Sequence, residues 1–483
     1  VVSSAASDVY KRQVIERERT MKPQVKEDLK PIIEDLLAAG IIRKASQQGP
    51  FLSNSHGVSK PEKGVHIAGK ADLHILKQSG QDTNHSRLTL DLRNLNENAV
   101  TRPKINLPTY EKLVSVFKDK HVTVADLRSM YWSIHTTYNS QHLSNFYFNN
   151  HVYTFCALPM GWINACFIGQ SATEKTYSQE TMMEFLKYKG WTTDSENWPF
   201  SDITEITILY MDDVCMYSPS NIPNDVQIHG NVIEFMLWAT ARWGFKIGPD
   251  KFSPFIKNFK FLGHYFRVEE AITTIPPTRL QAIKTFRTPR SCAETLSRLS
   301  VIAYHRRYVP AMKIIAAPLQ KMAMSGDFQW EELHQRAWKA LLLLTGLEFA
   351  SHVIDRSRPL FLCTDASQIS IAWVLYQIVN GEIQVINLDS KILKSSDRRK
   401  PAAVRESLGV VFALISNENA IKSHPEKTLL MTDCIGISCI LRSKATNEKM
   451  LENALYIFTF RDLHVKYTVG SSLFLADLIT RQY

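Results

Sequence analysis

Apolar residues recur at helical spacing in two parts of the chain. In the first part, Leu29 and Leu36 lie on one face, Pro31 suits a first turn, and Gly40 stands where a C-terminal cap belongs. This pattern predicts a helix that ends at Gly40. In the second part, from about residue 266 to residue 350, apolar faces alternate with Arg and Lys. This pattern predicts a basic module of several helices.

Strand patterns come before this helical module. Residues 87–93 alternate between apolar and polar side chains, and residues 122–126 form a short apolar run whose last residue is an Asp. Residues 206–217 are almost continuously apolar, which predicts two buried strands that meet at a tight hairpin. Residues 41–86 show neither period, so we expect irregular structure and a loop there.

The last third of the chain returns to strand patterns. Apolar runs at residues 361–367, 371–376 and 383–388 predict three strands, and the first of them contains Asp365. A helical pattern that begins near residue 404 contains Glu406, and it is followed by a strand that ends in Asp433. A late apolar segment, residues 473–480, contains Asp477. Any one of these acids is more often a cap or turn residue than a metal ligand, but together they form the kind of acidic set that two-metal nucleases use.

Two adjacent acids interrupt the apolar run at residues 206–217. Asp212 and Asp213 lie between apolar flanks, where unpaired carboxylates are costly and a bound divalent cation is the usual compensation. The alternative is that both are ordinary turn residues, since Asp favours turns. If the strand that ends in Asp126 lies beside this hairpin, Asp126 and Asp212 can share metal ions, and Mg²⁺ suits such hard oxygen ligands.

Arg87 and Asp91 lie on the polar face of the alternating strand at residues 87–93. An Arg at this place can bind a phosphate through two nitrogen atoms. An ion pair between Arg87 and Asp91 on a solvated face explains the same pattern equally well.

The composition narrows the class of protein. A chain of 483 residues suggests about three domains, and a net charge of +10 with a pI near 9.1 fits either a polyanionic partner or a solvated basic surface. The cysteines form no CxxC pair, which indicates a reduced, intracellular protein that is not secreted. The most apolar segment, residues 340–350, is too short to cross a membrane. Residues 1–13 are patternless, and we expect a non-native or disordered tail there.

The order of four motifs resembles the reverse transcriptases of retroviruses and gypsy-like LTR retrotransposons. These motifs are the strand with Asp126, Leu158 to Trp162, Tyr210 to Asp213, and Phe261 to His264. The resemblance implies an α+β multidomain fold, in which a right-hand polymerase precedes an RNase H-like α/β domain with a mixed sheet. It places the fingers and palm at residues 14–265, the thumb or connection at residues 266–350, and the RNase H-like domain at residues 351–483.

The resemblance also implies roles for individual residues of the polymerase. Asp126 and Asp212 would bind two Mg²⁺ ions, with Mn²⁺ as an alternative, and Asp213 would complete this acidic set. Tyr131 matches the steric gate that excludes a ribose 2′-hydroxyl. Further matches are a triphosphate-binding Arg at Arg87, a nucleotide-contacting loop at Gly161 and Trp162, and a basic residue at Lys251.

In the last third, the resemblance places Asp365, Glu406, Asp433 and Asp477 at the four ligand positions of an RNase H that uses two metal ions. The implied partners are an RNA template, a DNA primer, the RNA–DNA hybrid and dNTPs, with no membrane, and a homodimer is left open. The chain departs from the family at Met160, where a Gln is usual, and in insertions at residues 61–86 and 191–205.

The sequence therefore predicts an RNA-directed DNA polymerase with ribonuclease H activity from a retroelement Pol polyprotein. One alternative is a decayed or co-opted relative that binds nucleic acid without catalysis, although all seven candidate ligand acids are present. Another is a reverse transcriptase of the intron or telomerase type. That type lacks a second acidic set, so the residues from Asp365 to Asp477 argue against it.

Overall fold

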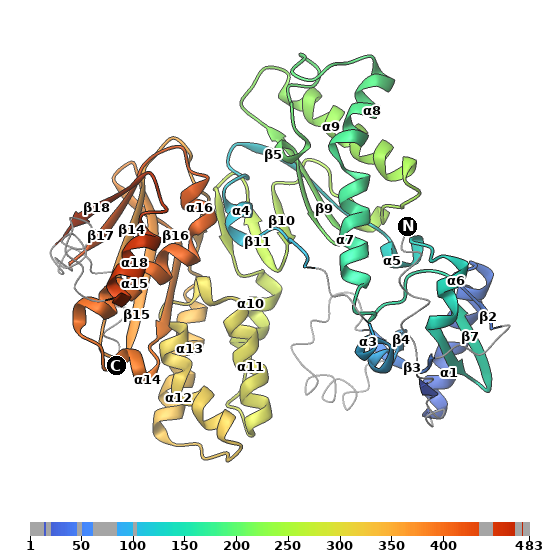
Figure 1. Cartoon of the computed structure of the whole chain (residues 1–483), viewed down its shortest axis with the longest axis horizontal. Coiled ribbons are helices and arrows are strands. Elements are labelled where there is room, and N and C mark those ends of the chain that lie inside the picture. The colour runs from blue at the N-terminus through green and yellow to red at the C-terminus, as the bar shows by residue number, and fades with distance from the viewer. Residues whose placement is uncertain are drawn as a thin grey trace. The chain divides into compact units, whose positions relative to one another are not determined.

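The computed structural model describes residues 14–15, 21–45, 51–60, 85–99, 104–433, 448–468 and 476 (Figure 1). These residues divide into two compact units. The first unit contains the described residues up to Pro108 and residues His121–Ile256, and the second contains Thr109–Lys120 and the described residues from Lys257 onward. No helix in the described part of the chain is both long enough and apolar enough to cross a membrane.

A mixed sheet with a helix packed against it opens the first unit. Helix α1 (Pro23–Ala38) begins at Pro23, so Pro31 lies inside the helix rather than in its first turn. Gly40 has a φ of +68° and directly follows the C-cap residue, as the sequence predicts. Strands form within residues 41–60, where an irregular segment was expected, so that expectation was wrong. The strands of this sheet are β1 (Val14–Ile15), β2 (Ile42–Lys44), β3 (Phe51–Lys60), β4 (His85–Leu90), β6 (Asn145–Phe148) and β7 (His151–Phe155).

A smaller three-stranded sheet carries the acids of the first unit. Its strands are β5 (Lys120–Asp126), β9 (Asp213–Pro219) and β8 (Thr207–Tyr210), in that order. Apolar side chains of this sheet pack against three helices, α7 (Ala165–Thr176), α8 (Gln179–Lys189) and α9 (Asp225–Arg242). The predicted hairpin at residues 206–217 is therefore confirmed as a buried element.

The insertion at residues 191–205 closes this core. Although its composition is polar, it contributes Trp198, which is fully buried, together with Phe200 and Ile203. Asp202 starts a short 3₁₀ helix with a capping box to Glu205. The insertion is thus a structural part of the first unit.

The second unit begins with a four-stranded sheet followed by helices. The sheet has the order β10 (Asn258–Phe261), β11 (His264–Arg267), β12 (Ile272–Thr274) and β13 (Ser351–His352). Between β12 and β13 lie the helices that the sequence predicts: α10 (Pro277–Lys284), α11 (Cys292–Tyr304), α12 (Met312–Ser325) and α13 (Glu332–Gly346).

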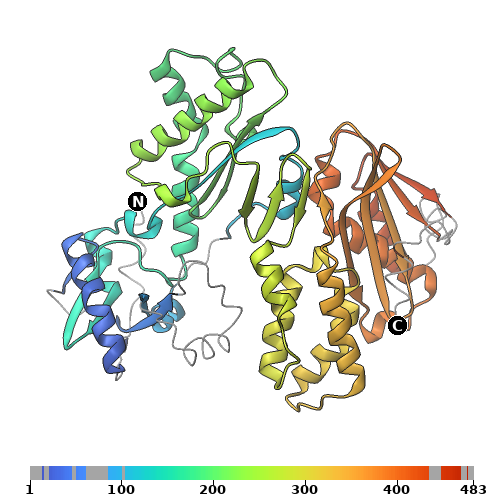
Figure 2. The ribbon, with the colours of Figure 1, turned by 180° about the vertical axis from the view of Figure 1, so that it is seen from behind.

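A five-stranded mixed sheet completes the second unit. Its central strand β14 (Leu360–Ala366) runs antiparallel to β15 (Ser370–Val379) and parallel to β17 (Thr428–Thr432). Helices α15 (Ala402–Ser416) and α18 (Glu448–Ile457) cover one face, which Figures 1 and 2 show from opposite sides. The outer strands are β16 (Glu382–Ile392) and β18 (Leu463–Tyr467).

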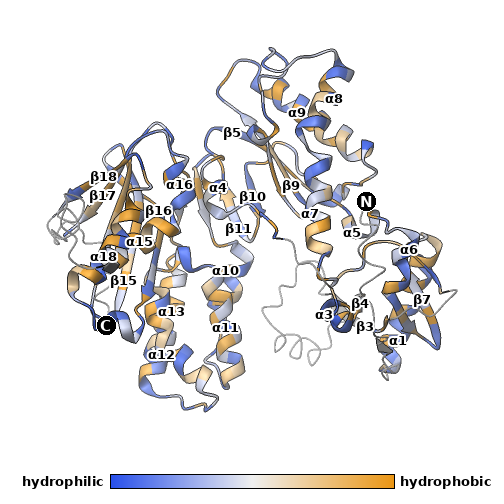
Figure 3. Cartoon of the chain, viewed as in Figure 1, coloured by the Kyte–Doolittle hydropathy of each residue, from blue (hydrophilic) through white to orange (hydrophobic). Residues whose placement is uncertain are grey.

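Both faces of this sheet are buried, which explains the continuous apolar runs in the sequence. Along β15, Trp373 packs in the core under α15, whereas Val374 packs in the core formed with α11, α12 and α13. Figure 3 shows the resulting apolar character of β14, β15 and α15. The helical module and the five-stranded sheet therefore share one hydrophobic core.

Candidate active sites

A two-residue turn presents the acids of the first unit. Tyr210 pairs with Asp213 across the hairpin, so Met211 and Asp212 form the turn. Met211 has a φ of +54°, which is unusual for a residue with a long side chain. Helix α7 holds this turn, because Met211 N–H donates to Gln170 Oε1 at 2.7 Å and Thr173 Oγ1 donates to the Met211 carbonyl at 2.8 Å. The turn geometry therefore depends on α7.

Asp126 lies beside this turn. Leu127 N–H donates to the Asp212 carbonyl at 2.8 Å, and Gly248 N–H donates to the Asp126 carbonyl at 3.1 Å. The ammonium of Lys251 forms an ion pair with the Asp126 carboxylate. The predicted neighbours Asp126, Asp212 and Lys251 are thus brought together.

Negative charge at this site is only partly compensated. Burial raises the pKa of the Asp212 carboxyl, and the nearby Asp126 carboxylate raises it further, while Lys251 acts in the opposite direction. Asp213, the first residue of β9, is half-buried. Asp126, Asp212 and Asp213 offer the carboxylate ligands that a divalent cation binds. Among the described residues, these three acids do not form a cluster as tight as the one in the second unit.

The predicted nucleotide contacts lie on elements around this turn. Tyr131 is on the short helix α5 (Met130–Ser133), and its hydroxyl lies 3.6 Å from Cys166 Sγ. Burial raises the pKa of Tyr131 well above its ordinary value, and the Cys166 thiol and the Asp212 charge add to this effect. The Arg87 backbone pairs with Val58 of β3, but its side chain lies outside the described residues. Within the predicted loop at residues 41–86, residues 46–50 and 61–84 lie outside the described part of the chain.

A hydrogen-bonding residue that the sequence did not single out holds the predicted nucleotide loop. Asn96 Nδ2 donates to the Gly161 carbonyl at 2.9 Å, and Asn96 Oδ1 accepts from Ile163 N–H at 2.8 Å. The intervening Trp162 packs against the apolar cluster around Leu92 and Leu95. Met160 is 39% exposed at the start of this loop.

Gln170 and Thr173 hold the turn at Asp212, and the sequence did not single them out either. Both are buried and lie three positions apart on α7, so they share one face of the helix. No pattern of apolar and polar residues singles them out, because the burial of a polar side chain is not visible in the sequence. Asp91 forms an ion pair with Arg93, whose Nη2 atom lies 2.5 Å from Asp91 Oδ2.

The second acidic cluster lies at the ends of two parallel strands. The register pairs Cys363 of β14 with Met431 of β17, so Asp365 and Asp433 lie two residues further on at the same level. Glu406 approaches them from α15, and the ligand atoms of the three acids all lie within 4.8 Å of one another. Asp477 lies outside the described residues.

The pKa of Glu406 reflects the excess of negative charge in this cluster. Burial and the charges of Asp365 and Asp433 raise the pKa of Glu406 to about 8. Its Oε2 atom is buried and has no hydrogen-bond partner within the described structure. Three converging carboxylates with an unpartnered oxygen fit a divalent cation, which would supply the missing charge.

The predicted hairpin at Phe261 to His264 packs against the segment from Ala303 to Pro310. Leu262 and Gly263 form its turn with φ values of +46° and +75°, and Tyr304 Oη donates to the Leu262 carbonyl at 2.8 Å. A side chain at Gly263 would not fit, because a Cβ would lie 2.6 Å from Tyr304 Cε1. His264 Nδ1 lies 2.8 Å from Tyr308 Oη. The run from Ala303 to Pro310 therefore supports this hairpin.

His264 makes the stability of the second unit depend on pH. Burial, with the positive charges of His305, Arg307 and Arg306, lowers the pKa of His264 from 6.5 to about 3. The unfolded chain then binds more protons than the folded chain between these values, so stability is lost as the pH falls from about 6.5 toward 3. One such histidine lowers the free energy of unfolding by about 1.4 kcal/mol at pH 5.5.

We expect urea unfolding of His264→Gln to lose less stability between pH 7.5 and pH 5.5 than unfolding of the parent chain. The exposed His464 provides the matched control, His464→Gln, which should keep the parent dependence. An equal pH dependence in both variants would show that His264 is not held neutral.

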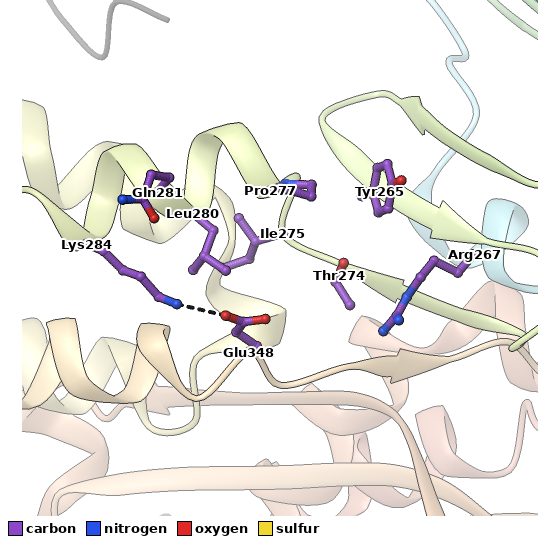
Figure 4. Close-up of a pocket in the computed structure, with 9 residues that line it drawn as sticks. All are labelled: Tyr265, Arg267, Thr274, Ile275, Pro277, Leu280, Gln281, Lys284 and Glu348. Atoms are coloured by element: carbon purple, nitrogen blue, oxygen red, sulfur yellow. Dashed lines mark hydrogen bonds and ion pairs between the residues drawn. The ribbon is translucent and has the colours of Figure 1, made fainter.

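A cavity of about 330 Å³ also lies in the second unit (Figure 4). Its apolar side is formed by residues such as Leu280 and Ile275, and an ion pair of 2.7 Å between Lys284 and Glu348 borders it. None of its lining residues belongs to the acidic clusters. The lining residues are Tyr265, Arg267, Thr274, Ile275, Pro277, Leu280, Gln281, Lys284 and Glu348.

Comparisons with known proteins identify two domains in the chain. A family model described as reverse transcriptase (RNA-dependent DNA polymerase) matches residues 75–266, and one described as an RNase H-like domain found in reverse transcriptase matches residues 355–460. The Pol polyprotein of the transposon gypsy from Drosophila melanogaster is 26% identical over 468 residues, which cover 93% of this chain and 40% of the relative. The Gag-Pol polyprotein of Walleye dermal sarcoma virus is 23% identical over 403 residues, which cover 83% of this chain and 20% of the relative.

Solved structures share the fold. Two structures of the foamy viral protease-reverse transcriptase in complex with double-stranded DNA have TM-scores of 0.73 and 0.71 at 16% identity. The matches cover 95% of this chain and 73% and 87% of those chains. This chain spans less than half the length of the gypsy polyprotein. Residues 75–266 therefore match a reverse transcriptase domain and residues 355–460 an RNase H-like domain found in reverse transcriptases, in a chain that is similar over most of its length to a retrovirus-related Pol polyprotein.

Proposed function

We propose that this chain copies RNA into DNA and then cleaves the RNA strand of the resulting hybrid. The observation that carries the proposal is the presence of two separate acidic sites on one chain. One site combines Asp126 and Asp212 at a turn held by α7, and the other combines Asp365, Glu406 and Asp433 within 4.8 Å. Both sets offer the hard oxygen ligands that Mg²⁺ prefers.

The two acidic sets would hold metal ions for two different reactions. Asp126 and Asp212 would hold Mg²⁺ ions, which in this chemistry lower the pKa of the attacking hydroxyl and neutralise charge on the phosphates. The turn at Met211 keeps the Asp212 carboxylate in place, and the Asn96 contacts keep the Gly161 loop in place for the nucleotide and template. Asp365, Glu406 and Asp433 would hold ions for hydrolysis of an RNA phosphodiester, and Asp477 would be the fourth ligand.

Several observations support nucleic acid as the partner. The chain has a net charge of +10, and structures with the same fold are complexes with double-stranded DNA or an RNA/DNA hybrid. We propose that this chain binds an RNA template, a DNA primer, their hybrid and dNTPs. Arg87 and Lys251 are the proposed cationic contacts to the triphosphate.

The proposal is tested by adding Mg²⁺ to chelator-treated protein with an RNA template, a labelled DNA primer and dNTPs. We expect primer extension that depends on the added ion and stops when a chelator is added again. Binding of the primer-template without any extension would instead support the alternative of a decayed relative that binds nucleic acid without catalysis.

We expect Tyr131→Val to increase incorporation of ribonucleotides by about tenfold or more relative to deoxyribonucleotides, because the ring would no longer block a 2′-hydroxyl. Single-nucleotide insertion kinetics with dNTPs and rNTPs measure this ratio. The exposed Tyr138 gives a control variant, Tyr138→Val. An unchanged ratio in Tyr131→Val would remove Tyr131 as the gate.

A further inference from the structure

The ring of Tyr131 rests on two positions of helix α7. Its hydroxyl lies 3.6 Å from Cys166 Sγ, within range of a weak hydrogen bond to sulfur. One turn further along the helix, a Cβ built on Gly169 would lie 3.0 Å from Tyr131 Cε1. Carbon atoms rarely approach so closely, so the ring occupies the space that a side chain at position 169 would need.

The same part of α7 also supports the acidic turn. The Cβ position of Gly169 lies 2.7 Å from the end of the Met130 side chain, and Thr173 Oγ1 lies 3.2 Å from Met130 Sδ. Thr173 Oγ1 also donates to the Met211 carbonyl, next to Asp212. Tyr131 and Asp212 are therefore positioned by one helix, and a change at Gly169 acts directly on the Tyr131 ring.

We propose that Gly169 and Cys166 form a seat for the Tyr131 ring and so set how strictly the nucleotide site excludes ribose. This inference rests on the proposed polymerase function and on Tyr131 as the gate. Gly169 and Cys166 are positioning residues, because they act through the ring and not on the nucleotide itself.

The two seat residues affect the ring in opposite ways. A methyl group at position 169 pushes the ring away from α7, which narrows the space beside the sugar. Loss of the Cys166 thiol removes the contact at the hydroxyl and gives the ring more freedom. Ribose exclusion should therefore become stricter in one variant and weaker in the other.

The test compares kcat/KM for dNTP and rNTP insertion. We expect the dNTP-to-rNTP ratio to rise about fivefold in Gly169→Ala and to fall about fivefold in Cys166→Ala, with Cys166→Ser restoring the parent ratio, since small changes in a pocket give effects of this size. Gly230→Ala is the matched control, because this helical glycine has open space around its Cβ position.

Double variants that also carry Tyr131→Val test whether the seat acts only through the ring. In Tyr131→Val, neither Gly169→Ala nor Cys166→Ala should change the ratio further. Ratios equal to that of Gly230→Ala, or shifts that persist without the ring, would overturn the seat.

Alkylation of Cys166 tests the same contact without catalysis. In the chain without nucleotide, Tyr131→Ala should increase the rate of Cys166 modification by iodoacetamide several-fold, with Cys292 as the internal reference in peptide mass spectra. Equal rates would overturn the seat even if the parent chain extends primers. A parent chain that extends no primer would overturn the proposed function instead, and the alkylation result would still decide the seat.

Discussion

Asp212→Asn is expected to lower the rate of primer extension by about 10³-fold, because loss of a carboxylate ligand removes several kcal/mol of charge stabilisation. The substitution keeps the shape of the side chain, and the turn is held through backbone atoms by Gln170, Thr173 and Leu127. The fold of the hairpin should therefore survive. Gel-based extension of a labelled primer on an RNA template measures the effect.

The same variant should cleave the RNA of a preformed hybrid at the parent rate. Asp194→Asn is the matched control, because Asp194 is exposed and has a φ of +57°, which Asn accepts. Persistent extension by Asp212→Asn would remove this acid from the polymerase site. Loss of both activities would contradict the assignment of two separate sites.

Asp433→Asn is expected to give the reverse result, with hybrid cleavage lowered by about 10³-fold and extension unchanged. Asp433 is one of three acids whose ligand atoms lie within 4.8 Å, so its charge is directly available to a bound cation. Release of a labelled RNA fragment from a preformed hybrid measures the effect. Its control is Asp462→Asn, an exposed acid of the same domain that should retain full cleavage.

Much of the second unit could be predicted from local pattern. The strands around Asp365 are apolar on both faces because helices cover both sides of the sheet, so their runs stand out in the sequence. The helix with Glu406 packs one face against this sheet, so its apolar residues recur at helical spacing. The apolar side chains of these elements are therefore enough to indicate that the elements are buried.

Other elements depend on partners that are distant in sequence. Strand β3 contains the buried polar residues Ser53 and Asn54, and its pairing with β6 and β4 makes it a strand. The insertion at 191–205 has a polar composition but packs through Trp198. Neither could be inferred from periodicity, because the stabilising contacts lie outside the segment.

The candidate sites show the same division. The acids lie on or directly beside apolar elements and were apparent from the sequence, whereas their supports were not. Asn96, Gln170 and Thr173 act through backbone atoms of loops and turns, and a polar residue at such a place looks like any solvated residue in the sequence. The pairing of Asp91 with Arg93 likewise depends on the turn into the helix at residues 93–97.

Polymerisation and RNA cleavage by the chain can be followed in a single reaction. The chain is incubated with Mg²⁺, dNTPs, a DNA primer with one label and an RNA template with another, and both labels are followed over time. We expect that the primer lengthens first and that the RNA is then cut within the newly formed hybrid. Template RNA that stays intact beside a fully extended primer, or a primer that is never extended, would contradict it.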